Sequence, residues 1–246
     1  MHIQFTGLYK LLALALLSLW TLRSQAQGVS SFSADVHLNS RGFGLQFNYL
    51  VPQSNTFSKK IITQFSSVKD PKEITITNLT LSNPDINNGG YEFGKINSMY
   101  AMRFGMGFEK PLAARPDKNA VGVIYSASAG LNLAVQSPTF IDYYDPSQVE
   151  KQFVTERYNP EIHQRQNIIQ SRGFFYGLKS AHILPGLFID QSFVYEFGKY
   201  SYLPNRITTG VLIDAHFIRP ELLYQNKHPS VFLTFYISFA ILNLEV

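Results

Sequence analysis

The sequence Val231-Phe232-Leu233-Thr234-Phe235-Tyr236-Ile237-Ser238-Phe239-Ala240-Ile241, close to the C-terminus, decides the fold. Every odd-numbered position in this stretch is large and apolar, whereas the even-numbered positions from 234 onward are threonine, tyrosine, serine and alanine. A period of two predicts a β-strand with two different faces, because successive side chains of a strand point to opposite sides. The apolar face needs a second sheet or lipid to cover it. We interpret the stretch as a strand of an outer-membrane β-barrel, with its mixed face toward the lumen.

The same alternation recurs along the chain in segments that polar or Gly- and Pro-containing stretches separate. Phe32 to Leu38 and Phe43 to Val51 alternate on either side of Asn39-Ser40-Arg41-Gly42, which predicts a hairpin. The other alternating segments lie at about residues 57–68, 95–108, 121–135, 174–178, 187–197, 207–217 and 231–241. They predict one all-β unit of antiparallel strands.

The strand count follows from parity, because both termini of such barrels lie in the periplasm and the number of strands is even. The alternating segments amount to nine, so we predict a tenth, short strand at residues 220–225. The prediction is a transmembrane antiparallel up-and-down β-barrel of ten strands with periplasmic termini, and eight strands are the alternative. It places both long connections, residues 69–91 and 138–171, on the extracellular side.

The N-terminus has the order of a secretory signal peptide. Lys10 precedes the apolar run 11–22, and Ser24-Gln25-Ala26 forms a small-residue cleavage site. We therefore predict a signal peptide at 1–26, export through the inner membrane, and a barrel domain at 27–246. No later stretch reaches the ~20 apolar residues of a transmembrane helix, so any membrane span is predicted to be a strand.

Composition excludes several classes of function. The chain has no cysteine, which excludes disulfides, thiolate metal sites and thiol catalysis. Its net charge is only slightly positive once the predicted signal peptide is removed, and this predicts no nucleic-acid partner.

The predicted lumen carries as many acidic as basic side chains. The inward positions hold four of each sign: Asp35, Asp190, Glu196, Asp214, Lys60, Lys95, Arg103 and Lys179. Opposite charges in a narrow space of low dielectric constant tend to pair, and side chains can fill a small barrel. We therefore predict a filled lumen, and rank a narrow channel for small solutes below it.

Two histidines of the predicted lumen offer an enzymatic alternative. His37 and His216 point inward, and Asp214 and several serines lie nearby in the predicted pattern, as a hydrolase acting on lipid or peptide would require. No nucleophile motif accompanies them, and hydrogen-bonded histidines in a polar interior explain them more simply. We predict no catalytic residues, with the hydrolase as the second choice.

The loop at 138–171 is the predicted binding surface, because long loops of such barrels carry function. Its candidate residues are aromatic, basic or imidazole side chains: Tyr143, Tyr144, Arg157, Tyr158 and His163. The tyrosines fit a contact surface for a protein partner and equally a belt at the lipid headgroups. The acidic groups of the loop have no known metal-ligand spacing, so we predict neither a metal nor a cofactor.

Several segments resemble a known group of proteins. Lys69-Asp70-Pro71-Lys72-Glu73, Tyr91-Glu92-Phe93-Gly94-Lys95-Ile96-Asn97, Arg157-Tyr158-Asn159-Pro160-Glu161-Ile162-His163 and Leu184-Pro185-Gly186-Leu187-Phe188 are similar to segments of small outer-membrane β-barrel proteins from Bacteroidota, of the OmpA/OmpX-like barrel class. The resemblance implies a barrel in the outer membrane of a Gram-negative bacterium, in contact with its lipid, and it brings no catalytic residues. We expect a non-enzymatic scaffold, or an accessory subunit of an outer-membrane complex, whose extracellular loops contact a protein partner.

Overall fold

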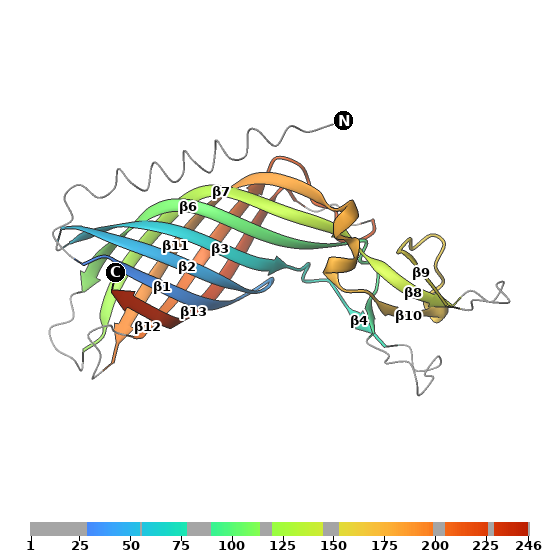
Figure 1. Ribbon diagram of the computed structural model, residues 1–246, viewed down its shortest axis with the longest axis horizontal. Coiled ribbons are helices and arrows are strands. Elements are labelled where there is room, and N and C mark those ends of the chain that lie inside the picture. Colours follow the sequence, from blue (N-terminus) through green and yellow to red (C-terminus); the bar gives the residue numbers. More distant parts are fainter. Residues whose placement is uncertain are drawn as a thin grey trace.

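The computed structural model describes residues 29–54, 56–77, 90–113, 120–144, 153–198, 205–225 and 229–245. They form a closed antiparallel β-barrel with a smaller extension beyond one end (Figure 1). The predicted signal peptide lies outside the described residues. The barrel strands are β1 (Ser31–Asn39), β2 (Gly42–Ser54), β3 (Phe57–Val68), β6 (Asn97–Ala113), β7 (Gly122–Pro138), β11 (His182–Phe197), β12 (Asn205–His216) and β13 (Val231–Glu245). Their order around the barrel is β1-β13-β12-β11-β7-β6-β3-β2, so the predicted fold is confirmed with eight strands.

Two of the ten predicted strands do not exist. The segment at 174–178 belongs to the 3₁₀ helix η4 (Phe174–Ser180), whose Phe174 and Tyr176 rings pack against Tyr100 and Phe140 at the barrel rim. Residues 220–225 form a loop that pairs only through an isolated bridge between Lys95 and Leu223. The apolar residues at 174–178 are spaced for packing on the rim and not for a strand. Without this segment eight alternating segments remain, which is already an even number of strands.

The connections sort to the two ends of the barrel. Residues 69–96 follow β3, residues 139–181 follow β7 and residues 217–230 follow β12, and all three leave from the end opposite the C-terminus (Figure 1). β1 closes the barrel against β13, from the pair Ser31 and Glu245 to the pair Asn39 and Tyr236. The two long connections therefore meet at one mouth.

The outer surface of the barrel is apolar on every strand. On β13 the odd positions from Val231 to Ile241 are between 37% and 67% exposed, and a register shift opposite Ala34 and Asp35 then turns Leu242 and Leu244 outward. Large exposed apolar side chains occur on the other seven strands too, among them Leu38, Leu45, Phe65, Phe104, Leu131, Ile189 and Ile213. No helix of the described residues is long and apolar enough to span a membrane.

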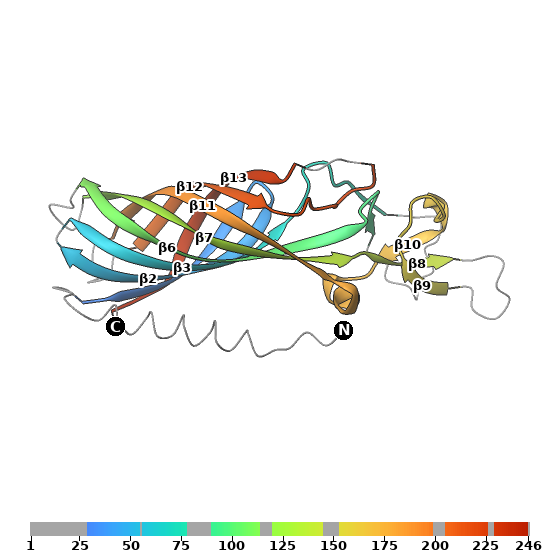
Figure 2. The ribbon, with the colours of Figure 1, turned by 90° about the horizontal axis from the view of Figure 1, so that it is seen from above.

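The extension continues from the barrel through β8 (Phe140–Tyr144), which follows β7 after a single residue. It contains β4 (Thr75–Ile76), β5 (Tyr91–Glu92), β9 (Phe153–Arg157), the 3₁₀ helix η3 (Arg165–Asn167) and β10 (Ile168–Ser171). The strands β10, β8 and β9 form a three-stranded sheet in this order beyond the mouth (Figure 2). β4 pairs with β5 in a two-stranded sheet at the same end of the molecule (Figure 1). Buried side chains pack between them: Tyr91, Ile141, Tyr158 and Ile168.

Candidate functional site

An ion pair between β6 and β12 crosses the middle of the lumen. The Nε and Nη2 atoms of Arg103 donate to the two carboxylate oxygens of Asp214 at 2.7 and 2.8 Å, and Nη1 donates to Ser66 Oγ at 2.7 Å. Asn132 Nδ2 also donates to Asp214, at 2.7 Å. Both charged side chains are buried, and these hydrogen bonds compensate the loss of water around them.

A second polar layer surrounds Asp190. Tyr236 Oη donates to its carboxylate at 2.9 Å, and Gln64 Nε2 lies 3.3 Å from Oδ2. Gln64 also donates to Gln46, and a chain of amide hydrogen bonds continues from there to the Asp35 carboxylate. This layer and the apolar contacts of Ile62, Phe188 and Leu212 with Tyr236 fill the cross-section of the barrel.

The third layer lies toward the end of the barrel that holds the C-terminus. Arg206 contacts Glu109 at 2.5 Å and Glu196 at 3.5 Å, and Lys60 lies 3.7 Å from Glu109 and donates to Ser126 at 3.0 Å. Glu109 and Arg206 lie one residue outside the predicted strands 95–108 and 207–217, so they were not among the predicted lumen residues. Extending the alternation by one residue in each strand would have placed both side chains inward.

The opposite mouth is covered by residues 217–225. Leu222 is fully buried in a cluster with side chains from five barrel strands: Val68, Met99, Ala101, Ala134, Leu184 and Phe232. The Leu222 carbonyl accepts from Ile96 N at 2.9 Å, and the Glu221 carbonyl accepts from Asn97 and Gln136. An apolar plug therefore closes the lumen above the ion pair of Arg103 and Asp214.

The predicted lumen residues divide into three groups. Asp35, Lys60, Arg103, Asp190, Glu196 and Asp214 lie on barrel strands and take part in the layers just described. Lys95 lies at the mouth instead, where its Nζ contacts Glu73 at 2.8 Å. The prediction for Lys179 is wrong, because this side chain is exposed on η4, outside the barrel.

The candidate catalytic residues do not form a triad. The Asp214 carboxylate accepts from Arg103 and Asn132, while the His216 ring packs edge-on against Phe232. The His37 ring lies 6.1 Å from that of Tyr236. Among the described residues no hydrogen bond joins a serine hydroxyl to either imidazole, and no group of acidic and histidine side chains is arranged to hold a metal ion.

The extension has its own buried polar centre at Asp142 on β8. Its carboxylate accepts from Thr155 and Gln170 at 2.7 Å each, and from Arg172 Nε at 2.8 Å. Burial alone would raise the pKa of Asp142, but these three donors outweigh it and hold the pKa below its ordinary value. Asp142 on β8 therefore holds β10 and Arg172, which begins the segment between β10 and η4, in place.

The loop residues predicted as a binding surface are only partly on the surface. Tyr158 and His163 are buried and stacked on each other, and Tyr143 packs against the His163 ring at 4.8 Å. Tyr158 Oη accepts from Gly94 N, and burial raises the pKa of this tyrosine. Arg157 is exposed and Tyr144 half-buried. Tyr158 and His163 are thus part of the packed interior of the extension.

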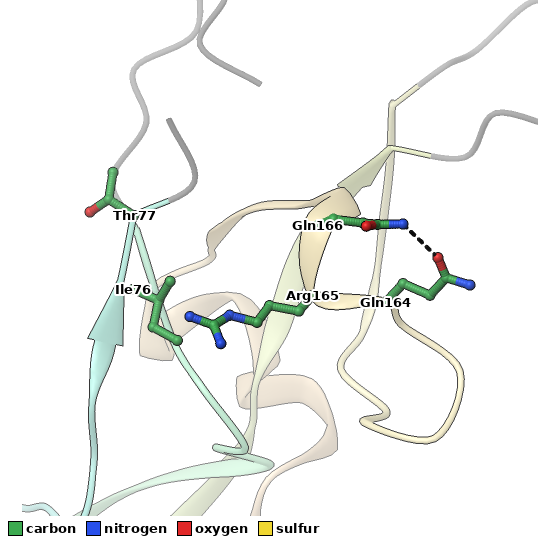
Figure 3. Close-up of a pocket in the computed structure, with 5 residues that line it drawn as sticks. All are labelled: Ile76, Thr77, Gln164, Arg165 and Gln166. Carbon is green, nitrogen blue, oxygen red and sulfur yellow. Dashed lines mark hydrogen bonds between the residues drawn. The ribbon is translucent and has the colours of Figure 1, made fainter. Parts of the chain in front are cut away.

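A hollow of about 660 Å³ lies between β4 and η3, lined by Ile76, Thr77, Gln164, Arg165 and Gln166 (Figure 3). Arg165 extends across it toward Ile76, and its guanidinium lies 5.6 Å from the ring centre of Phe93. Gln166 Nε2 donates to Gln164 Oε1 at 3.1 Å. The hollow is polar on the η3 side, and nothing in the sequence pattern indicated it.

Comparison with known proteins assigns no family to the chain. No family model and no curated protein matches the chain. Among solved structures, the chain is similar to Ail, the attachment invasion locus protein of Yersinia pestis, determined in complex with the heparin analogue sucrose octasulfate. The identity is 10% over 88% of this chain and 97% of Ail, with a TM-score of 0.32. That likeness is too low to transfer a property of Ail to this chain.

Proposed function

We propose that this chain is an integral outer-membrane β-barrel that works without catalysis, as a scaffold or accessory subunit that presents its extension to a protein partner outside the cell. The apolar outer face of all eight strands supports insertion into lipid, because soluble monomers rarely expose apolar patches above a few hundred Å². The barrel strands have between 9 and 17 residues, and about 9 suffice to cross the membrane. The source in Bacteroidota stays a prediction.

The filled lumen argues against a channel. Three polar layers and the Leu222 plug cross the lumen one after another. A conducting pore needs a continuous path of water past such layers. We therefore expect no discrete conductance steps from the protein in planar bilayers.

The extension is the observation that carries the proposal. It is held by an apolar cluster, the Asp142 centre and the ion pair between Lys95 and Glu73, so it forms a defined surface beyond the mouth. Large apolar side chains remain exposed on it: Ile162 is 69% exposed and Phe93 50%. Ordered loops with exposed aromatic groups are typical of protein-binding surfaces.

Residues 140–171, which carry the three-stranded sheet and η3 of the extension, can be removed from the chain without cutting a barrel strand. Ile141 and Ser171 are paired across β8 and β10, so a short Gly-Ser linker can join Thr139 to Arg172 without straining the barrel. The tagged protein and this deletion variant would be purified in mild detergent from native outer membranes. We expect a stoichiometric partner with the full chain and none with the variant.

A point variant separates binding from folding. The double substitution Phe93→Ser and Ile162→Ser changes two exposed side chains and should weaken partner binding, whereas Gln164→Ser, which is exposed and polar, should not. If the full chain is recovered alone under conditions that preserve other outer-membrane complexes, the scaffold proposal is contradicted.

A further inference from the structure

The outer face of β11 carries one polar side chain in the middle of an apolar row. Its outward positions from Ile183 to Phe197 are Ile, Pro, Leu, Ile, Gln, Phe, Tyr and Phe, and the glutamine is Gln191. Gln191 is exposed, and its amide has no hydrogen-bond partner among the residues that the structure describes. In the hydrocarbon of a membrane such an amide is strongly disfavoured unless another group pairs with it.

Gln191 borders a hollow in the outer wall of about 440 Å³. The outward side chains that line it come from four strands: Tyr125, Gln191, Phe193, Thr209, Val211 and Phe235. Gly210 leaves room for the inward-facing Ser192 and the ring of Tyr236 to pack closely against it, and all three residues also border the hollow. Ala127, the neighbour of Gln191 on β7, is too small to cover the amide.

We infer that this face, the Gln191 face, binds a second copy of the chain within the membrane. A glutamine amide has both hydrogen-bond donors and an acceptor. Two copies related by a two-fold axis at Gln191 can therefore pair their amides, each amide nitrogen donating to the amide oxygen of the other copy. A lipid acyl chain could fill the hollow but has no group to pair with the amide. The inference rests on the membrane insertion proposed above, and goes beyond it by assigning a partner to one wall of the barrel.

A threonine elsewhere on the outer face provides a matched control. Thr63 also points outward within an apolar row, between Ile61 and Phe65 on β3, three strands away from β11. A threonine hydroxyl can bond to its own backbone, so its position needs no partner. Thr63→Val and Gln191→Leu therefore each remove an outward polar group from an apolar row, and we expect only the second to change association.

The test uses the full chain in lipid vesicles over a range of protein-to-lipid ratios. The chain has no cysteine, so a single Ser180→Cys on η4 allows labelling for energy transfer between copies. We expect Gln191→Leu to raise the protein fraction needed for half-association about tenfold, Gln191→Asn to raise it less, and Thr63→Val to leave it unchanged. A short thiol cross-linker should join copies carrying Ala127→Cys and not copies carrying Phe65→Cys.

The outcomes separate this inference from the proposed function. Failure of the protein to insert into vesicles, judged by protease protection of the strands, overturns both. Insertion with a monomer at every ratio, with or without a lipid retained in the hollow, overturns only the dimer. Association that Gln191→Leu leaves unchanged also overturns it, because the amide would then have no part in the contact.

Discussion

The barrel and the extension each contain an aspartate that accepts from an arginine and an amide, and their surroundings differ. In the lumen, the Arg103 and Asp214 side chains are 2% and 3% exposed. In the extension, Arg172 is 44% exposed and Asp142 is 11% exposed. Water can replace Arg172 around Asp142, whereas nothing can replace either partner inside the barrel. The same hydrogen bonds should therefore matter far more to the barrel than to the extension.

The largest effect is expected from Asp214→Leu. It leaves Arg103 buried without a counter-charge, which should lower the free energy of unfolding by about 3–5 kcal/mol. Urea unfolding in lipid vesicles, followed by circular dichroism, would measure the change. The double variant Arg103→Met and Asp214→Leu should recover most of the loss, because it buries no charge. A double variant less stable than the single one would contradict the assignment of this cost to the unpaired arginine.

The next effect is expected at the mouth. Leu222→Ala removes the side chain at the centre of the apolar plug and should destabilise residues 217–225 by about 2–3 kcal/mol. Limited proteolysis of the intact barrel should then cut this segment faster, with no change in the unfolding of the strands. Leu223→Ala, at a half-buried neighbouring position, is the control and should leave the cleavage rate close to that of the unaltered protein.

The barrel strands could be predicted because their alternating pattern lies within each short segment of sequence. The extension could not be predicted, because contacts between distant residues hold it together. The eleven residues from Val231 to Ile241 are enough to predict a strand with two different faces. The same alternation of outward and inward positions on other strands places lumen residues such as Arg103 and Asp214. Lys179 was misplaced because the spacing of Phe174, Tyr176 and Leu178 in a rim-packed 3₁₀ helix imitates a strand. The extension depends on contacts such as that of Asp142 with Gln170, 28 residues apart, which no periodicity encodes.

A smaller effect is expected from acidification of the extension. Because the pKa of Asp142 is lower in the folded state, its contribution to stability is complete above the unfolded value near 4 and is lost as the pH falls through the folded value. Resistance of residues 140–171 to an acid-active protease should be constant from pH 7 to 5 and fall below about pH 4. Asp142→Asn should cost about 1 kcal/mol at pH 7 and weaken this pH dependence. A pH profile identical in the variant would assign the acid sensitivity to another group.

The smallest effect is expected where the plug segment touches the extension. Tyr224 Oη donates to Glu161 at 2.5 Å, and this hydrogen bond raises the pKa of Tyr224. The phenol is exposed, so Tyr224→Phe should leave the free energy of unfolding close to that of the unaltered protein. Absorbance titrations of the two proteins should differ by one tyrosine that ionises above the ordinary range, and Glu161→Gln should return that tyrosine to its ordinary pKa. Leu222 is anchored inside the barrel and Asp142 inside the extension, so Tyr224→Phe should change the rate of proteolysis neither at residues 217–225 nor in the extension. A changed rate in either region would show that the contact of Tyr224 with Glu161 couples them.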